Sequence, residues 1–215
     1  MDQNAHNWGC GIYAEWTRRR VAKLVQILGK EWFPGKRVLD VGAGHGMNGK
    51  AIIELGADVL FTDARQHHVD VLKRDGYNAE VMDNEKEWTV QGPFDLIVHW
   101  GLLYHVDNWK QDVRCAVERT PLLCLETLIG LGDDPNEEVK VPELLTTQDH
   151  AVSGIGTIMP AIVFENYVAS LGCTFQRYDD ADMTVAGHHR YDWDINVGVD
   201  YIDKRGQRRF WMVRR

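Results

Sequence analysis

The sequence predicts an α/β protein in which helices cover a parallel β-sheet on both faces. One repeated pattern supports this fold class. Between residues 36 and 126, short apolar runs of about five residues alternate with amphipathic segments. This alternation is typical of βαβ units, which place their strands side by side in a parallel sheet. In such sheets ligands bind beyond the carboxyl ends of the strands, so candidate site residues are sought there.

Each predicted element follows from local spacing. A first helix is expected over 11–28, where apolar residues recur at helical spacing and Gly29 ends the run. Beyond residue 36, apolar runs predict strands and amphipathic segments predict helices. The predicted strands are 37–41, 58–62, 78–82, 94–99 and 122–126, and the predicted helices between them are 48–55, 66–74 and 109–118.

The last third of the chain has a weaker hydrophobic periodicity than the part before it. Over 127–159 the periodicity is weak, and connections of this length are usually functional covers or partly disordered. A helix over 160–171 starts at its proline and is followed by a predicted strand over 174–178. The end of the chain, 197–213, is expected to form a hairpin whose second arm is 210–213.

Composition bounds the class of protein. The chain has 215 residues, with 24 Lys+Arg against 32 Asp+Glu and a net charge of −8. This length indicates one domain, and the acidic balance disfavours a protein that coats nucleic acid through phosphate contacts. No apolar run approaches the roughly 18 residues that a membrane span needs, and no secretory signal is visible at the start of the chain. With four widely spaced cysteines, we expect reduced thiols, packed mostly as small apolar side chains, in a cytoplasmic protein.

A glycine-rich turn joins the first predicted strand to the next helix. Gly42, Gly44 and Gly46 follow the strand directly, and glycine allows a sharp turn and close approach of a ligand to the backbone. Asp63, at the end of the second strand, is placed to accept hydrogen bonds from ribose hydroxyls. Met47 stands where a dinucleotide fingerprint would have its third glycine, so the spacing alone leaves the choice of nucleotide open.

Several motifs in order along 36–126 resemble the class I S-adenosylmethionine-dependent methyltransferase family. They are the stretch Asp40-x-Gly42-x-Gly44-x-Gly46, Asp63, and the segments 81–84, 94–98 and 103–107. Residues 100–105 are also similar to the corresponding stretch of the carboxymethyltransferases that modify tRNA wobble uridine. The family resemblance implies a Rossmann-like seven-stranded sheet flanked by helices, with the last strand antiparallel and an N-terminal helix.

The resemblance also implies S-adenosyl-L-methionine as the cofactor. The glycine turn would line its methionine moiety and ribose, Asp63 would bind the ribose hydroxyls, and Asp83 would approach the adenine. The implied cofactor-binding residues are Asp40, Gly42, Ala43, Gly44, Gly46, Asp63, Ala64, Met82, Asp83, Asn84, His99 and Trp100. A single domain over 1–215 would then comprise an N-terminal helical extension (1–35), a cofactor-binding half (36–126) and a substrate-side half (127–215).

Three residues near the strand ends are candidates for chemistry at the acceptor. Methyl transfer from a sulfonium needs mainly positioning, and it needs a base only if the acceptor must lose a proton. His105 suits proton removal at neutral pH, or it braces its loop. Tyr104 is expected to hydrogen-bond the acceptor or to form a pocket wall. Glu126 is expected to be a base, a substrate clamp or a cap for the loop that follows.

Other clusters receive structural interpretations. The arginine run 18–20 and the histidine pair 67–68 are expected to be solvated helix faces. The histidines at 188 and 189 point to opposite faces if they lie on a strand, so no metal site is expected over 188–194. Trp8, Tyr13 and Trp16 are expected either to close over the cofactor or to be ordinary buried rings.

The sequence therefore predicts a methyltransferase whose partner is a small-molecule acceptor. The alternative is a methyl or carboxymethyl transferase acting on RNA of the tRNA type, which would be held by the basic C-terminal hairpin and the arginine run at 18–20. An NAD(P)-dependent reductase is disfavoured by the glycine spacing, and a non-catalytic cofactor-binding subunit by the intact glycine turn and Asp63. No membrane partner is expected, and the acceptor atom and the oligomeric state are left open.

Overall fold

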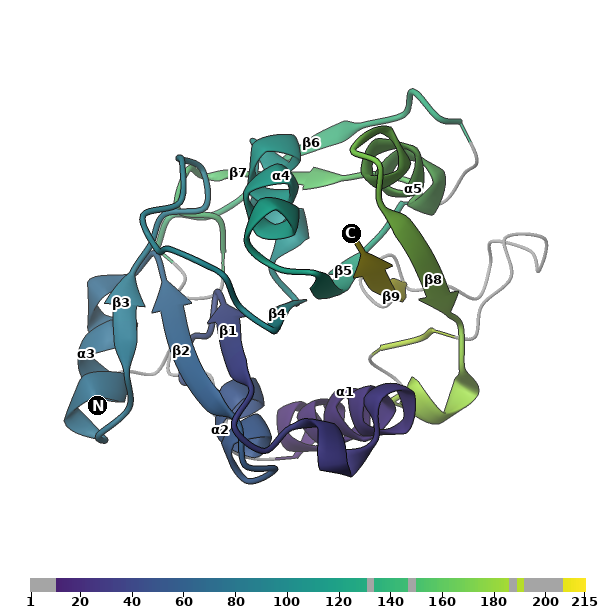
Figure 1. Cartoon of the computed structure of the whole chain (residues 1–215). Coiled ribbons are helices and arrows are strands. Elements are labelled where there is room, and N and C mark those ends of the chain that lie inside the picture. Colours follow the sequence, from purple (N-terminus) through teal and green to yellow (C-terminus); the bar gives the residue numbers. More distant parts are fainter. Residues whose placement is uncertain (1–10, 131–133, 147–149, 186–188, 192–206) are drawn as a thin grey trace.

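The computed structural model describes residues 11–130, 134–146, 150–185, 189–191 and 207–215 (Figure 1). A seven-stranded sheet runs through the middle of this part of the chain, in the order β3-β2-β1-β4-β5-β9-β8. Its strands are β1 (Arg37–Val41), β2 (Asp58–Asp63), β3 (Ala79–Val81), β4 (Leu96–Trp100), β5 (Leu122–Leu128), β8 (Thr174–Tyr178) and β9 (Arg208–Arg214). β9 is antiparallel to both of its neighbours, whereas β1 to β5 pair in parallel. The predicted fold class, including the antiparallel last strand, is confirmed.

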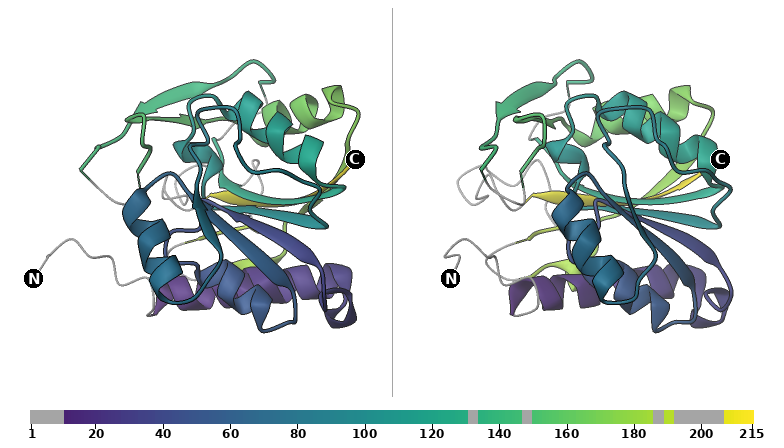
Figure 2. Two further views of the ribbon diagram at one scale, coloured as in Figure 1. Left: turned by 60° about the vertical axis from the view of Figure 1, so that its left-hand side comes forward. Right: turned by 90° about the vertical axis from the view of Figure 1, so that its left-hand side faces the viewer.

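Helices cover both faces of this sheet (Figure 2). One face carries α1 (Ile12–Leu28), α2 (Met47–Ile53) and α3 (Gln66–Arg74), and the other carries α4 (Trp109–Arg119) and α5 (Ala161–Ser170). Each face has its own apolar core, because strand side chains alternate between the two faces.

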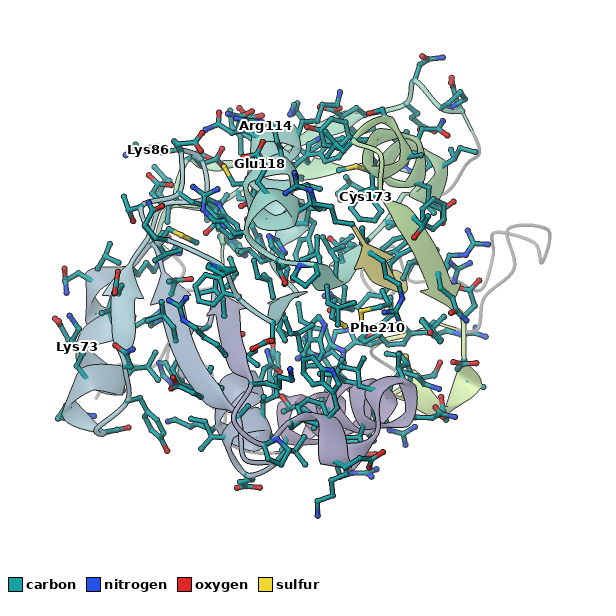
Figure 3. The ribbon with its side chains drawn as sticks, in the orientation of Figure 1. Lys73, Lys86, Arg114, Glu118, Cys173 and Phe210 are labelled. Carbon is teal, nitrogen blue, oxygen red and sulfur yellow. The ribbon has the colours of Figure 1, made fainter. Side chains whose placement is uncertain are left out.

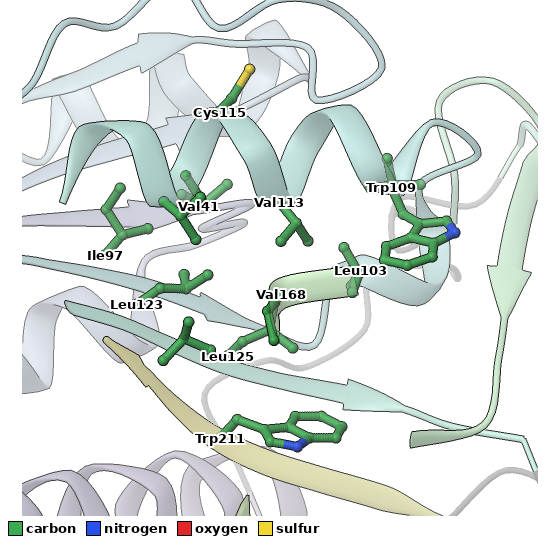
Figure 4. Packing of buried hydrophobic residues seen from close by; sticks show 14 of the residues in the cluster. Val41, Ile97, Leu103, Trp109, Val113, Cys115, Leu123, Leu125, Val168 and Trp211 are labelled. Carbon is green, nitrogen blue, oxygen red and sulfur yellow. The ribbon is translucent and has the colours of Figure 1, made fainter. Parts of the chain in front are cut away.

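The alternation is clear on β9. Phe210 is buried in the core under α1, and Trp211 is buried in the core under α4 and α5. Figure 4 shows the second core, in which Val113 points from α4 toward the strands of the sheet, where Leu123 and Leu125 of β5 lie. Burying a large apolar side chain of this kind stabilises the fold by about 1.5–3 kcal/mol. Charged side chains such as Lys73 project from the outside of the molecule (Figure 3).

The stretch 127–159 contains regular structure that its sequence did not predict. β6 (Val139–Pro142) and β7 (Ile155–Ile158) pair as an antiparallel ribbon, and β7 packs against the short 3-10 helix η2 (Leu103–His105). We call β6, β7 and the described residues between them the flap. The flap therefore lies beside the carboxyl ends of the strands, as a cover over that edge would.

Most of the other predicted elements differ from the structure by one or two residues at an end, whereas the helix at 66–74 and the strands at 37–41 and 174–178 have the predicted bounds. The first arm of the hairpin expected over 197–213 lies outside the described residues, and β9 pairs with β8 and β5. Cys115, Cys124 and Cys173 are buried free thiols, as predicted. Among the described residues, no helix combines the length and the apolar character that crossing a bilayer requires.

Candidate functional site

A pocket opens along the carboxyl edge of the sheet. It extends from the end of β2, past the ends of β1 and β4, to the start of β9. The flap closes one side through Ala151 and its neighbours, and α1 closes another through Tyr13 and Trp16. The sequence-predicted site residues that line this pocket are Gly42, Ala43, Gly44, Asp63, Ala64, Asp83, Asn84, Trp100, Tyr104 and His105.

The remaining predicted site residues lie beneath the pocket wall. Asp40, Met82, His99 and Glu126 are all buried, and Gly46 packs against apolar side chains of β2 and α3. The sheet therefore brings the two groups together as a lining layer and a supporting layer. Adjacent positions on a strand point to opposite faces, so residues next to each other in a motif do not all reach the ligand side.

Asp63 ends β2 with its carboxylate held in a fixed orientation. One oxygen accepts the backbone N–H of Gly44 at 2.8 Å, and the other accepts that of Arg65 at 2.8 Å. Nδ1 of His68 lies 3.1 Å from the same carboxylate. Burial alone would raise the pKa of Asp63, but His68 and the two N–H groups lower it overall. The carboxylate is therefore ionised at neutral pH and is a strong hydrogen-bond acceptor.

The prediction of a solvated histidine pair at 67–68 is wrong for His68. His67 is exposed, whereas His68 is 2% exposed because it shares the sheet-facing side of α3 with Val69 and Leu72. The sequence contains a signal for this, since residues 68, 69 and 72 lie on one side of a helix.

The glycine turn leaves backbone accessible at the end of β1. Gly42, Gly44 and Gly46 all have positive φ. A Cβ on Gly42 would lie 2.6 Å from the side chain of Leu102, whereas the Cβ position of Gly44 is open within 4 Å. The turn thus requires glycine for its conformation, and at Gly44 it also offers free space to a ligand.

Two acidic side chains organise the supporting layer. Asp40 accepts the backbone N–H of Gly49 at 2.9 Å, and burial raises its pKa to about 7. Asp112 of α4 accepts a hydrogen bond from the side-chain amide of Asn84, and Nε2 of His99 lies 2.6 Å away. Sequence reasoning missed Asp112, since its partners come from distant segments. It fixes the orientation of Asn84 at the pocket.

Two arginines line the other end of the pocket. Arg20 of α1 and Arg208 of β9 are both 4% exposed, and their Nη1 atoms lie 3.2 and 3.0 Å from the carboxylate of Glu126. Glu126 is itself fully buried and holds both guanidinium groups from behind. The prediction of a solvated face over 18–20 is wrong for Arg20, because three consecutive helical residues span most of a turn and this one faces the sheet.

Aromatic rings surround these guanidinium groups. The guanidinium carbon of Arg20 lies 3.7 Å from the ring centre of Trp16, and that of Arg208 lies 4.4 Å from it. The Trp16 indole donates a hydrogen bond of 2.6 Å to the hydroxyl of Tyr191, and Arg208 donates one of 3.2 Å to the Tyr104 hydroxyl. Trp16 is thus both buried and part of the pocket wall, whereas Trp8 lies outside the described residues.

His105 forms a pair with a carboxylate of the flap. Its Nδ1 lies 2.7 Å from one oxygen of Glu143 and 2.9 Å from the other, and the N–H of Ala151 donates to the same carboxylate at 2.6 Å. Burial alone would raise the pKa of Glu143, but its contact with His105 lowers it overall. Sequence reasoning missed Glu143, because it lies in a stretch whose periodicity gives no signal.

The polar segment 188–194 is one in which the sequence predicts no metal site. The structure describes 189–191 of this segment, and the other members lie outside the described residues. In the part of the chain that is described, no three His, Cys, Asp or Glu side chains gather as ligands of a metal ion would.

A Rossmann-like sheet, a glycine turn after β1 and a carboxylate at the end of β2 define a nucleotide-binding protein of the class I methyltransferase type. The family model described as a methyltransferase domain matches residues 13–147, and the chain belongs to this family. The predicted methyltransferase family is thereby confirmed.

Two solved structures share this fold along almost the whole chain. An S-adenosylmethionine-dependent methyltransferase from Mesorhizobium loti is 19% identical, with a TM-score of 0.63, over 94% of this chain and 98% of that one. Magnesium protoporphyrin IX methyltransferase from Synechocystis PCC 6803, with bound S-adenosylhomocysteine, is 12% identical, with a TM-score of 0.63, over 97% and 91%.

Curated relatives match over shorter stretches. Protein-L-isoaspartate O-methyltransferase from Hahella chejuensis is 30% identical over 119 residues, 52% of this chain and 49% of that protein. A mitochondrial ubiquinone biosynthesis O-methyltransferase from Schizosaccharomyces pombe is 27% identical over 95 residues, 40% of this chain and 35% of that protein. The matches thus span about half, or less, of the length of these relatives.

Proposed function

We propose that this protein transfers a methyl group from S-adenosyl-L-methionine to a small-molecule acceptor, and that His105 removes the proton of the acceptor. One pocket joins the ionised carboxylate of Asp63 to the His105–Glu143 pair, and this observation carries the proposal. Two similar folds support the cofactor and a small acceptor. One is the magnesium protoporphyrin IX methyltransferase with bound S-adenosylhomocysteine, and the other is a domain of EvdMO1 crystallised with S-adenosylhomocysteine and D-fucose.

The end of the pocket near β2 fits an adenosyl group. Asp63 supplies an acceptor for ribose hydroxyls, and the open Cβ position at Gly44 leaves room for the sugar against the backbone. Asp83 and Asn84, which follow the next strand, offer polar atoms at the place where the base would lie. These residues would hold the cofactor.

The middle of the pocket fits the chemistry of transfer. When bound, S-adenosyl-L-methionine supplies a methyl group on a positively charged sulfur, which an acceptor lone pair displaces in line. Glu143 faces Nδ1 of His105, which favours the tautomer with a proton on Nδ1 and leaves Nε2 to accept the proton of the acceptor. Glu143 is a positioning residue in this arrangement. Trp100 and Tyr104 line the same space and exclude water from it.

A small acceptor is favoured over RNA by the state of the C-terminal arginines. Arg208 and Arg209 are both buried and ion-paired, with Glu126 and Asp179 respectively. These two charges therefore face inward, where an RNA backbone cannot reach them. In the described part of the basic hairpin, only Arg214 and Arg215 are exposed to a partner such as RNA.

The cofactor is tested by calorimetric titration with S-adenosylmethionine, S-adenosylhomocysteine and NAD in parallel. We expect micromolar binding of the two sulfur compounds and none of NAD. Binding of NAD alone would overturn the proposal.

The base is tested by screening small acceptors with methyl-labelled cofactor. On an acceptor that becomes labelled, His105→Ala should lower kcat by about 10²–10⁴-fold without changing the affinity for S-adenosylhomocysteine. Glu143→Gln should lower kcat less and shift its pH profile, and His67→Ala, a histidine exposed on α3, should behave as wild type. Unchanged kcat in His105→Ala would remove the base from the mechanism while leaving methyl transfer intact.

A further inference from the structure

We propose that the acceptor carries an anionic group, a carboxylate or a phosphate, which binds to Arg20 and Arg208 at the β9 end of the pocket. The inference rests on the proposed function, because it names the class of acceptor for the same pocket.

The charges at this end of the pocket are ordered from front to back. Arg20 and Arg208 line the pocket, whereas their shared partner Glu126 is fully buried and does not line it. Each guanidinium uses Nη1 to reach Glu126, and Arg20 uses Nη2 to donate to Asn48 at 3.1 Å. Nε of Arg20 is buried and has no hydrogen-bond acceptor among the described residues. Arg208 also donates from Nε to His189 at 3.1 Å and from Nη2 to the Tyr104 hydroxyl at 3.2 Å. A ligand that enters the pocket therefore meets positive charge first, with the neutralising carboxylate behind it.

The charges are also ordered along the edge of the sheet. Asp83 follows β3 and Asp63 ends β2, so these carboxylates lie at one end of the pocket, with Arg65 as a neighbouring cation. Arg208 begins β9, beyond β1, β4 and β5 in the sheet order. The acidic end suits hydroxyl and amino groups of an adenosyl moiety, whereas the basic end suits an anion. An acceptor anchored at the basic end would direct the rest of its body toward the middle of the pocket, where His105 lies.

The two guanidinium groups are preorganised for such an anion. The guanidinium carbons of Arg20 and Arg208 lie 3.7 and 4.4 Å, respectively, from the ring centre of Trp16. The guanidinium carbon of Arg20 also lies 5.3 Å from the ring centre of Trp100. Arginine stays charged at all accessible pH values, and its planar group matches carboxylate and phosphate oxygens. Because these side chains are already ordered, little conformational entropy is lost when an anion binds. The aromatic walls formed by Trp16, Trp100 and Tyr104 favour an acceptor with a planar body.

The rival occupant is the amino-acid carboxylate of the cofactor itself. S-adenosylhomocysteine carries this carboxylate, and 5′-methylthioadenosine lacks it. Arg208→Gln should leave the affinity for both compounds within about twofold of wild type, because the site serves the acceptor. If Arg208→Gln weakens S-adenosylhomocysteine more than tenfold and spares 5′-methylthioadenosine, the guanidinium groups bind the cofactor and the inference is overturned.

The acceptor preference is tested on protein saturated with S-adenosylhomocysteine. Saturation-transfer NMR would compare each of three acids with its neutral amide. The pairs are benzoate with benzamide, phenylacetate with phenylacetamide, and indole-3-acetate with indole-3-acetamide. Phenyl phosphate would be added as the second kind of anion. We expect transfer to the acids or to phenyl phosphate and at least tenfold less to the amides. Equal transfer within the pairs, or no transfer to any of the anions, would overturn the inference.

Variants assign the preference to the named residues. Arg208→Gln should abolish the preference for anions, Arg208→Lys should retain part of it, and Arg209→Gln should leave it unchanged. Arg209 is a matched control, because it is the next residue of β9, is equally buried and pairs with Asp179 away from the pocket. A preference that survives in Arg208→Gln would refute the assignment. Failure of wild-type protein to bind S-adenosylhomocysteine would instead refute the proposed function.

Discussion

Replacing Glu126 with glutamine removes the negative charge that Arg20 and Arg208 share while keeping the size of the side chain. The carboxylate lies 3.2 and 3.0 Å from the two guanidinium groups, and all three side chains are at most 5% exposed. Removing one partner of a buried ion pair typically costs about 3–5 kcal/mol, because the remaining charge is left uncompensated. The two arginines line the pocket and are not enclosed in the core, so we expect Glu126→Gln to lose about 3 kcal/mol of stability, the low end of that range.

The assay is urea unfolding followed by tryptophan fluorescence, with the m-value used to check that two-state behaviour is retained. Asp75→Asn is the control, because Asp75 forms a partly exposed pair with Lys50 at 3.8 Å and should change stability by less than about 1 kcal/mol. The double variant Glu126→Gln/Arg208→Gln should be more stable than Glu126→Gln alone, since it removes one of the uncompensated charges. A loss below about 1 kcal/mol in Glu126→Gln would refute the account of a buried, charge-coupled triad.

Two further carboxylates give predictions of different kinds. Asp63→Asn removes the charge that accepts hydrogen bonds from the N–H groups of Gly44 and Arg65. In calorimetry it should weaken the binding of S-adenosylhomocysteine by at least ~1.5 kcal/mol. Unchanged affinity in folded protein would mean that the ribose lies elsewhere. The pKa of Asp40 is raised from its ordinary 3.8 to about 7, so its contribution to stability is present below about pH 4 and is lost as the pH rises toward 7. Asp40→Asn keeps an acceptor for the N–H of Gly49 and should remove this pH dependence from the free energy of unfolding measured without ligand. If the slope of that free energy against pH is the same in Asp40→Asn as in wild type, the raised pKa is contradicted.

Local sequence signals located most of the regular elements. The helix at 66–74 and the strands at 37–41 and 174–178 have the predicted bounds, because alternation of apolar residues and flanking turn residues are properties of short segments. The antiparallel order of the sheet edge came from family resemblance, since pairing between distant strands leaves no local pattern. The ribbon of β6 and β7 was missed because its strands are short and partly exposed.

The site was predicted less completely than the fold, and for a physical reason. The glycine turn and Asp63 are close in sequence and could be read together, whereas Glu126 is 106 residues from Arg20 and 82 from Arg208. A charge at such a distance cannot be paired from one sequence, so Arg20 was expected in solvent. The same holds for Glu143, which lies 38 residues from His105.

The net charge of the protein does not determine the sign of its ligand. The chain carries a net charge of −8. If the net charge alone set the electrostatic potential in the pocket, a neutral or cationic small molecule would be favoured. The field inside a pocket is set instead by the few groups that line it, because the interior screens charge less than water does. Here Arg20 and Arg208 stand at the pocket wall with Glu126 behind them, so an acidic protein presents a basic surface to its ligand. Arg208, one of the arginines that suggested an RNA surface from the sequence, is thereby better explained as part of an anchor for a small anion.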